Sequence, residues 1–122
     1  MPVILIVDDS VTIRQQVEFT LGRDNKFEIV KAENGKDALA ALEKTKNVDL
    51  IISDINMPGM SGLDLLEKIK ADGTYASIPF VLLTTEGSED KVERAKAAGA
   101  KGWITKPFVP EHLLEMATRL TS

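Results

Sequence analysis

The sequence has no cysteine and no long apolar run. The first absence excludes disulfide bonds, thiolate zinc sites and cysteine nucleophiles. A membrane-spanning helix needs roughly 20 consecutive apolar residues, and no run approaches that length. The first residues also lack the basic stretch and small-residue cleavage site of a signal peptide. We therefore expect a cytoplasmic protein that does not insert into membranes.

The chain also lacks an excess of positive charge. Its 15 lysines and arginines are outnumbered by 19 aspartates and glutamates, so the net charge is −4. A protein that coats nucleic acids needs a basic surface, so we expect no nucleic-acid partner. The 122 residues, 43% of them hydrophobic, suffice for one soluble domain with its own core. We expect a monomeric single domain over residues 1–122, with no output domain.

Four short, mostly apolar runs predict strands, at residues 3–7, 50–52, 80–84 and 102–105. A fifth strand is predicted at 27–32, where Phe27 and Ile29 alternate with polar residues, as in a strand near the edge of a sheet. Each of the five strands is followed by a segment in which apolar residues recur at helical spacing. Strict alternation of strands and helices predicts an α/β fold with a doubly wound parallel sheet and right-handed crossovers. Residues that typically cap or open helices precede the helical segments: Ser10, Asn34, Ser61, Ser88 and Pro110.

One stretch ends a buried strand with an acid. The run at 50–52 is typical of a strand buried on both faces. Asp54 follows it, and Pro58-Gly59 then predicts a turn. The sequence thus places a carboxylate at the carboxyl end of a core strand, the end at which open parallel sheets bind ligands.

Other polar residues follow other predicted strands in the same way, and all should meet at one edge of the sheet. Three carboxylates there would repel one another by about 4 kcal/mol per pair at 4 Å and an effective dielectric near 20. Bound Mg²⁺ would relieve this repulsion. A carboxylate can attack phosphorus, and a lysine and a hydroxyl nearby would stabilise the anionic group. The residues are Asp8, Asp9, Asp54, Thr84, Thr105 and Lys106.

Each of these residues alone also has an ordinary explanation. Acids before a helix are favoured by its dipole, and threonines are common in strands. Trp103 is more often a packing residue, and His112, the single histidine, is given no catalytic role. The joint position of the set at one predicted edge favours a phosphoryl-acceptor site with Asp54 as nucleophile.

Four blocks of sequence resemble the receiver domain of two-component response regulators, in particular the stand-alone CheY-like chemotaxis type. The resemblance covers essentially the whole chain and implies a flavodoxin-like (βα)5 fold with strand order 2-1-3-4-5. The blocks are Ile4-Leu-Ile-Val-Asp8-Asp9-Ser10, Asp54-Ile-Asn-Met57-Pro58-Gly-Met60-Ser-Gly62, Leu83-Thr84-Thr85-Glu86, and Ala98-Gly-Ala-Lys-Gly-Trp103-Ile-Thr-Lys106-Pro107-Phe108.

The resemblance implies the chemistry of the site. Asp54 would accept a phosphoryl group from the phosphohistidine of a sensor histidine kinase. Mg²⁺ would be bound by Asp9, Asp54 and the backbone carbonyl of Asn56, with Asp8 acting mostly through water. Lys106 would contact the phosphoryl group.

The resemblance also implies a switch. Thr84 would supply the switch hydroxyl, and Trp103 takes the place of the switch aromatic, which is usually Tyr or Phe. Asn56 and Glu86 occupy the two positions that tune dephosphorylation. The Lys106–Pro107 peptide bond would be cis.

The output would come from a downstream protein that binds the face made by the fourth helix, the fifth strand and the fifth helix. Lys91, Trp103 and Phe108 would lie on that face, as would residues near Pro110 and Glu111. The resemblance implies a role in chemotaxis or motility. The alternative is a phosphorelay intermediate that passes the phosphoryl group to a histidine phosphotransfer protein.

Three other classes of protein fit less well. Phosphatases with an aspartate nucleophile use Asp-x-Asp, and Asn56 cannot protonate a leaving group, so we expect no enzyme beyond self-phosphorylation and self-dephosphorylation. An FMN carrier would not place Asp8 and Asp9 beside a phosphate. A degenerate receiver acting only as a scaffold is disfavoured by the intact set of acids, Thr84 and Lys106.

Overall fold

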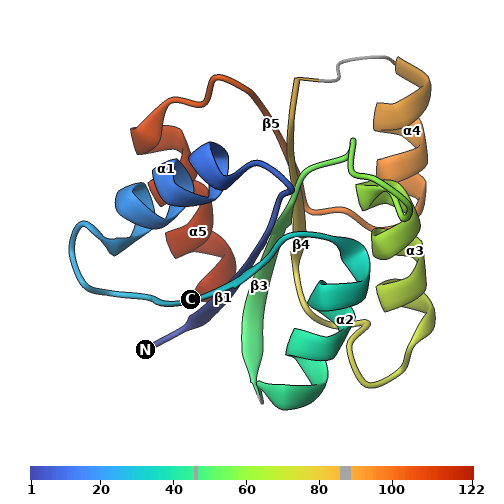
Figure 1. The fold of residues 1–122 in the computed structure, drawn as a ribbon, viewed down its shortest axis with the longest axis horizontal. Helices are drawn as coiled ribbons and strands as arrows, with labels where there is room; N and C mark the ends of the chain where they lie inside the picture. The colour runs from blue at the N-terminus through green and yellow to red at the C-terminus, as the bar shows by residue number, and fades with distance from the viewer. Residues whose placement is uncertain (46, 86–88) are drawn as a thin grey trace.

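The computed structural model describes residues 1–45, 47–85 and 89–122, over which strands and helices alternate (Figure 1). Among these residues, no helix has both the length and the apolar character to cross a membrane. The elements are β1 Val3–Val7, α1 Val11–Gly22, β2 Glu28–Ala32, α2 Gly35–Lys44, β3 Val48–Ser53, α3 Gly62–Ala71, β4 Phe80–Thr84, α4 Glu89–Ala97, β5 Gly102–Thr105 and α5 Pro110–Thr121.

The strands form one sheet in the order β2-β1-β3-β4-β5, and every neighbouring pair is parallel. The predicted fold class and strand order are therefore confirmed. The bounds of β1, β4 and β5 are those predicted, whereas β2 begins one residue later and β3 extends beyond the apolar run at 50–52. Strand β2 lies at an edge of the sheet, which explains its more exposed, polar pattern.

Helices cover both faces of the sheet (Figure 1). Helices α1 and α5 lie on one face, and α2, α3 and α4 lie on the other. Strand β1 shows the consequence, because Ile4 and Ile6 join the core cluster under α1 and α5 while Leu5 and Val7 join the opposite cluster. A strand buried on both faces needs apolar residues at successive positions, and β1 is buried throughout.

The helices begin where the sequence predicts. Ser10, Asn34 and Ser61 each cap a helix by accepting a hydrogen bond from a backbone N–H three residues further on. Pro110 opens α5. The predicted cap Ser88 lies outside the described residues. The loops between strand ends and these caps are short, so the carboxyl edge of the sheet is tightly defined.

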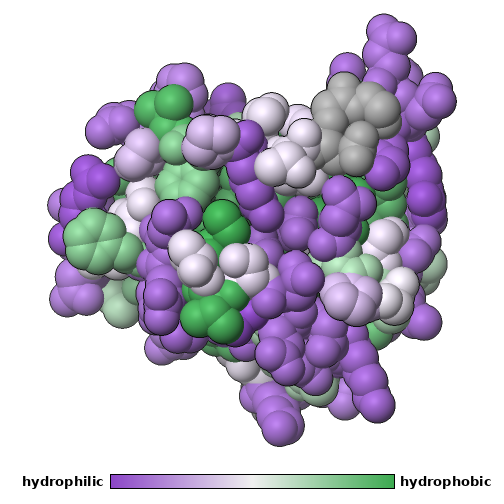
Figure 2. Space-filling view, turned by 45° about the horizontal axis from the view of Figure 1, so that its top comes forward, coloured by the Kyte–Doolittle hydropathy of each residue, from purple (hydrophilic) through white to green (hydrophobic). Residues whose placement is uncertain are grey.

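The surface in Figure 2 is mostly hydrophilic, and its apolar residues form separate patches. Four large apolar side chains are exposed among the described residues: Met1, Val11, Phe19 and Val109.

Candidate functional site

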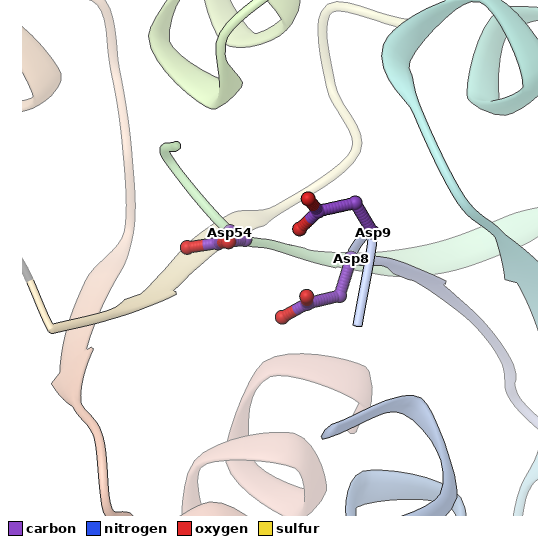
Figure 3. Close-up of side chains that lie close together, drawn as sticks. All are labelled: Asp8, Asp9 and Asp54. Atoms are coloured by element: carbon purple, nitrogen blue, oxygen red, sulfur yellow. The ribbon is translucent and has the colours of Figure 1, made fainter. Parts of the chain in front are cut away.

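The three acids singled out in the sequence meet at the carboxyl edge of the sheet (Figure 3). Asp8 follows β1 and Asp54 follows the neighbouring strand β3, where the Asp54 N–H donates to the Val7 carbonyl at 2.9 Å. Carboxylate oxygens of Asp8, Asp9 and Asp54 lie within 4.8 Å of one another. Hard oxygen donors at this spacing suit a divalent cation such as Mg²⁺.

Asp8 is held on every side. It is 2% exposed. One carboxylate oxygen accepts from the Ser10 N–H at 2.9 Å, and the other accepts from Lys106 Nζ at 2.8 Å. The Asp8 N–H donates to the Ala32 carbonyl at 3.1 Å. Asp8 therefore has a fixed orientation, whereas Asp9 is exposed to solvent.

Lys106 connects two of the acids. It follows β5, and its backbone N–H donates to the Thr84 carbonyl at 2.9 Å. Its ammonium lies 2.8 Å from Asp8 Oδ2 and 3.4 Å from Asp54 Oδ1. The Lys106–Pro107 peptide bond is cis, which confirms the prediction. One largely buried cation thus faces two buried carboxylates.

The pKa of Asp54 is raised from its usual value of 3.8. Burial is the largest cause, and the charge of Asp8 adds to it. Lys106 and the Ile55 N–H, which donates to Asp54 Oδ1 at 2.8 Å, act in the opposite direction. The ionised form of Asp54 is thus incompletely stabilised by the protein, and a cation bound to the acids would complete the stabilisation.

The remaining predicted site residues differ in burial. Thr84 is fully buried at the end of β4 and lies opposite Thr105, which is exposed. Trp103 lies opposite Leu82 and is partly buried against the core. Asn56 is exposed, and Glu86 lies outside the described residues.

Two contacts around the site were not predicted. A Cβ atom at Gly62 would lie 1.9 Å from the Asp54 carbonyl oxygen, so α3 can begin this close to Asp54 only with glycine. Arg14 donates from Nη1 to the Asp8 carbonyl oxygen at 2.5 Å. Two features of the sequence could have indicated these contacts. One is the glycine directly after the cap Ser61, and the other is a basic residue in the first turn of α1, where the helix dipole favours acids.

A cleft of about 600 Å³ reaches Asp9 from the surface. It lies between the loop after β3 and the start of α2, and the acid cluster is therefore accessible from this side. Its lining residues are Asp9, Glu33, Asn34, Gly35, Lys36, Pro58, Gly59 and Met60.

Comparison with known proteins gives a consistent result. Residues 4–118 match the family described as the response regulator receiver domain. The chemotaxis protein CheY1 of Helicobacter pylori is 40% identical over 112 residues, which are 92% of this chain and 90% of that protein. A chemotaxis protein CheY homolog of Campylobacter jejuni is also 40% identical, over 92% of this chain and 86% of its own.

A solved structure of the Vibrio cholerae chemotaxis protein CheY4 superposes with a TM-score of 0.90, at 43% identity and 98% coverage of both chains. The predicted resemblance is thus confirmed by sequence and by fold. The chain belongs to the response regulator receiver domain family of two-component signalling, with chemotaxis CheY proteins among its relatives.

Proposed function

We propose that this protein is a phospho-acceptor signalling switch in which Asp54 takes a phosphoryl group from the phosphohistidine of a sensor histidine kinase. The observation that carries the proposal is the position of Asp54. Its buried carboxylate lies 3.4 Å from Lys106 Nζ and within 4.8 Å of Asp8 and Asp9. The similarity to chemotaxis proteins supports an output in chemotaxis or motility.

The residues divide the chemistry among them. An Asp54 oxygen forms a bond to phosphorus while the bond between phosphorus and the donor's imidazole nitrogen breaks, and that nitrogen keeps the electron pair. Lys106 neutralises charge on the phosphoryl oxygens. Asp9, Asp54 and the Asn56 carbonyl would hold Mg²⁺, with Asp8 acting through water, and the ion would supply further positive charge.

The same proposal covers the output. The hydroxyl of Thr84 turns towards the phosphoryl group, and Trp103 on the adjacent strand responds, so a downstream protein binds a changed face of α4, β5 and α5. A cleft of about 540 Å³ between β5 and α5, lined in part by Trp103, Val109 and Met116, offers a place for such a partner. Asn56 and Glu86 tune the rate of dephosphorylation.

Intact-mass measurement after incubation with acetyl phosphate and Mg²⁺ tests the acceptor. The wild type should gain one phosphoryl group, and Asp54→Asn should gain none. Asp64→Asn is the matched control, because Asp64 is an exposed acid in α3 and its loss should leave phosphorylation intact. An equal mass gain on Asp54→Asn would show that another residue is the nucleophile.

A further inference from the structure

We propose that Arg14 is a positioning residue that holds the turn carrying Asp8 and Asp9 in the geometry that a metal ion needs. The inference rests on the proposed function, because it concerns the metal ligands of that site. Arg14 lies in the first turn of α1, and its side chain reaches back six positions to the Asp8 carbonyl oxygen, to which Nη1 donates at 2.5 Å. This contact spans the turn between β1 and α1.

Arg14 completes a set of contacts that immobilises Asp8. The N–H of Asp8 is bound to Ala32, and its two carboxylate oxygens are bound to Ser10 and Lys106. The guanidinium is the donor to the carbonyl oxygen. Because Asp8 is 2% exposed, water is a poor substitute for a lost donor. Removing Arg14 would therefore loosen the turn that aims Asp8 and Asp9 at Asp54.

The position of Arg14 also needs an explanation that helix formation does not give. Cations are disfavoured in the first turn of a helix, where the dipole presents positive charge. Helix α1 has no acid in its first turn, so Arg14 is not offset there by a neighbouring carboxylate of the same turn. The contact with the Asp8 carbonyl supplies the missing explanation.

Two roles for Arg14 predict opposite effects on metal binding. A cation that acts only through its charge repels Mg²⁺, so its removal would tighten Mg²⁺ binding. A residue that orients the ligands strengthens binding, so its removal would weaken it. Substitution of residues that orient metal ligands typically weakens metal affinity by about 10- to 100-fold. We expect substitution of Arg14 to have an effect within this range.

Titration with MgCl2 by isothermal calorimetry separates these roles. Arg14→Gln should weaken Mg²⁺ binding by about 10-fold, and Arg14→Lys, which keeps the charge but loses the planar fork, should lie between Arg14→Gln and the wild type. Arg23→Gln is the matched control, since it removes the same charge at the other end of α1. Its Mg²⁺ affinity should stay within about twofold of the wild type.

Urea unfolding in EDTA provides a readout without metal, in which Arg14→Gln should unfold at a lower urea concentration than Arg23→Gln. A folded Arg14→Gln protein that binds Mg²⁺ as tightly as the wild type, or more tightly, overturns the positioning role. If Arg14→Gln does not fold, Arg14→Lys decides in the same way. Absence of Mg²⁺ binding by the wild type itself would overturn the metal assignment of the proposed function, and this inference with it.

Discussion

Two regions of the molecule are built from the same ingredients, two carboxylates and one cation. The first is the proposed acceptor site at the carboxyl edge of the sheet. The second joins α3 to α4 on the surface. The site triad is Asp8, Asp54 and Lys106, and the surface triad is Asp64, Glu67 and Arg94.

The two triads hold their carboxylates in opposite ways. In the surface triad, hydrogen bonds lower the pKa of both acids. At Asp64 the largest cause is the hydrogen bond from the Ser61 backbone, and at Glu67 it is the hydrogen bond from Arg94. In the site triad, burial raises the pKa of Asp54 despite the nearby ammonium. The surface side chains are 45–51% exposed, whereas those of the site are 3–11% exposed. At Asp54, burial together with the charge of Asp8 outweighs the nearby ammonium, so the anion is disfavoured there and a further positive charge would stabilise it.

Removing the cation from each triad should change the rate of phosphorylation very differently, and this is the largest effect that we expect. Lys106→Gln should slow phosphorylation by acetyl phosphate by about 100- to 1,000-fold, the cost typical of losing one preorganised donor to a transition-state oxygen. Arg94→Gln removes the same charge on the surface and should leave the rate nearly unchanged. Time-resolved intact-mass analysis measures both rates, after circular dichroism has shown that both variants are folded. Equal slowing in the two variants would mean that net charge, and not position, governs the reaction.

Neutralising one acid in each triad should give stabilities with opposite dependence on pH. The pKa of Asp54 is raised in the folded state, so between pH 3.8 and the folded-state pKa the folded protein binds more protons than the unfolded chain. The free energy of unfolding therefore falls as the pH rises through this range. Without metal at pH 7, Asp54→Asn should be more stable than the wild type by about 0.5–2 kcal/mol. This advantage should shrink as the pH falls towards 3.8.

Asp64 should behave in the opposite way. The pKa of Asp64 is lowered in the folded state, so this carboxylate stabilises the fold above pH 3.8. The stabilisation is lost as the pH falls towards the folded-state pKa. Asp64→Asn should therefore be less stable than the wild type at pH 7, with a deficit that fades in acid. Urea unfolding in EDTA between pH 3 and 7 measures both curves. Parallel curves for the two variants would refute the difference in burial as the cause.

The sequence predicted the fold and the meeting of the three acids, because both follow from alternation and from parallel strands ending at one edge. Strands β1, β4 and β5 have the predicted bounds, since apolar residues dominate each strand and a polar residue follows it. The predicted start of β2 is one residue too early. Phe27 is buried, but it precedes the strand in the structure.

The contacts that distinguish the triads could not be predicted in this way. Arg94 lies 27 and 30 positions from Glu67 and Asp64, so their pairing depends on how α4 docks on α3. The contact of Arg14 with Asp8 depends on the backbone geometry of the segment between β1 and α1. The close approach of Gly62 to Asp54 depends in the same way on the loop between β3 and α3. The crowding of carboxylates at one edge predicts that the pKa of Asp54 is raised, but that burial contributes more than the charge of Asp8 does not follow from spacing in the sequence.

The smallest expected effect tests whether the two triads communicate with the same part of the molecule. Trp103 is the single tryptophan, so its fluorescence reports one place. The site triad is connected to it through β5, because Lys106 follows that strand and donates to Thr84 at the end of β4. Beryllofluoride with Mg²⁺, which mimics the acyl phosphate, should draw the Thr84 hydroxyl inward and favour a different packing of Trp103. We therefore expect a shift in Trp103 emission and in its access to a quencher.

Two variants locate the route of this shift. Thr84→Ala should reduce the shift while Asp54 still accepts a phosphoryl group, since the hydroxyl and not the acceptor is removed. Arg94→Gln should leave the shift intact, because the ion pairs of the surface triad join α4 to α3. A shift lost in Arg94→Gln and kept in Thr84→Ala would place the coupling in the surface triad. That result would reverse the comparison, since the exposed triad would then carry the signal that we assign to the buried one.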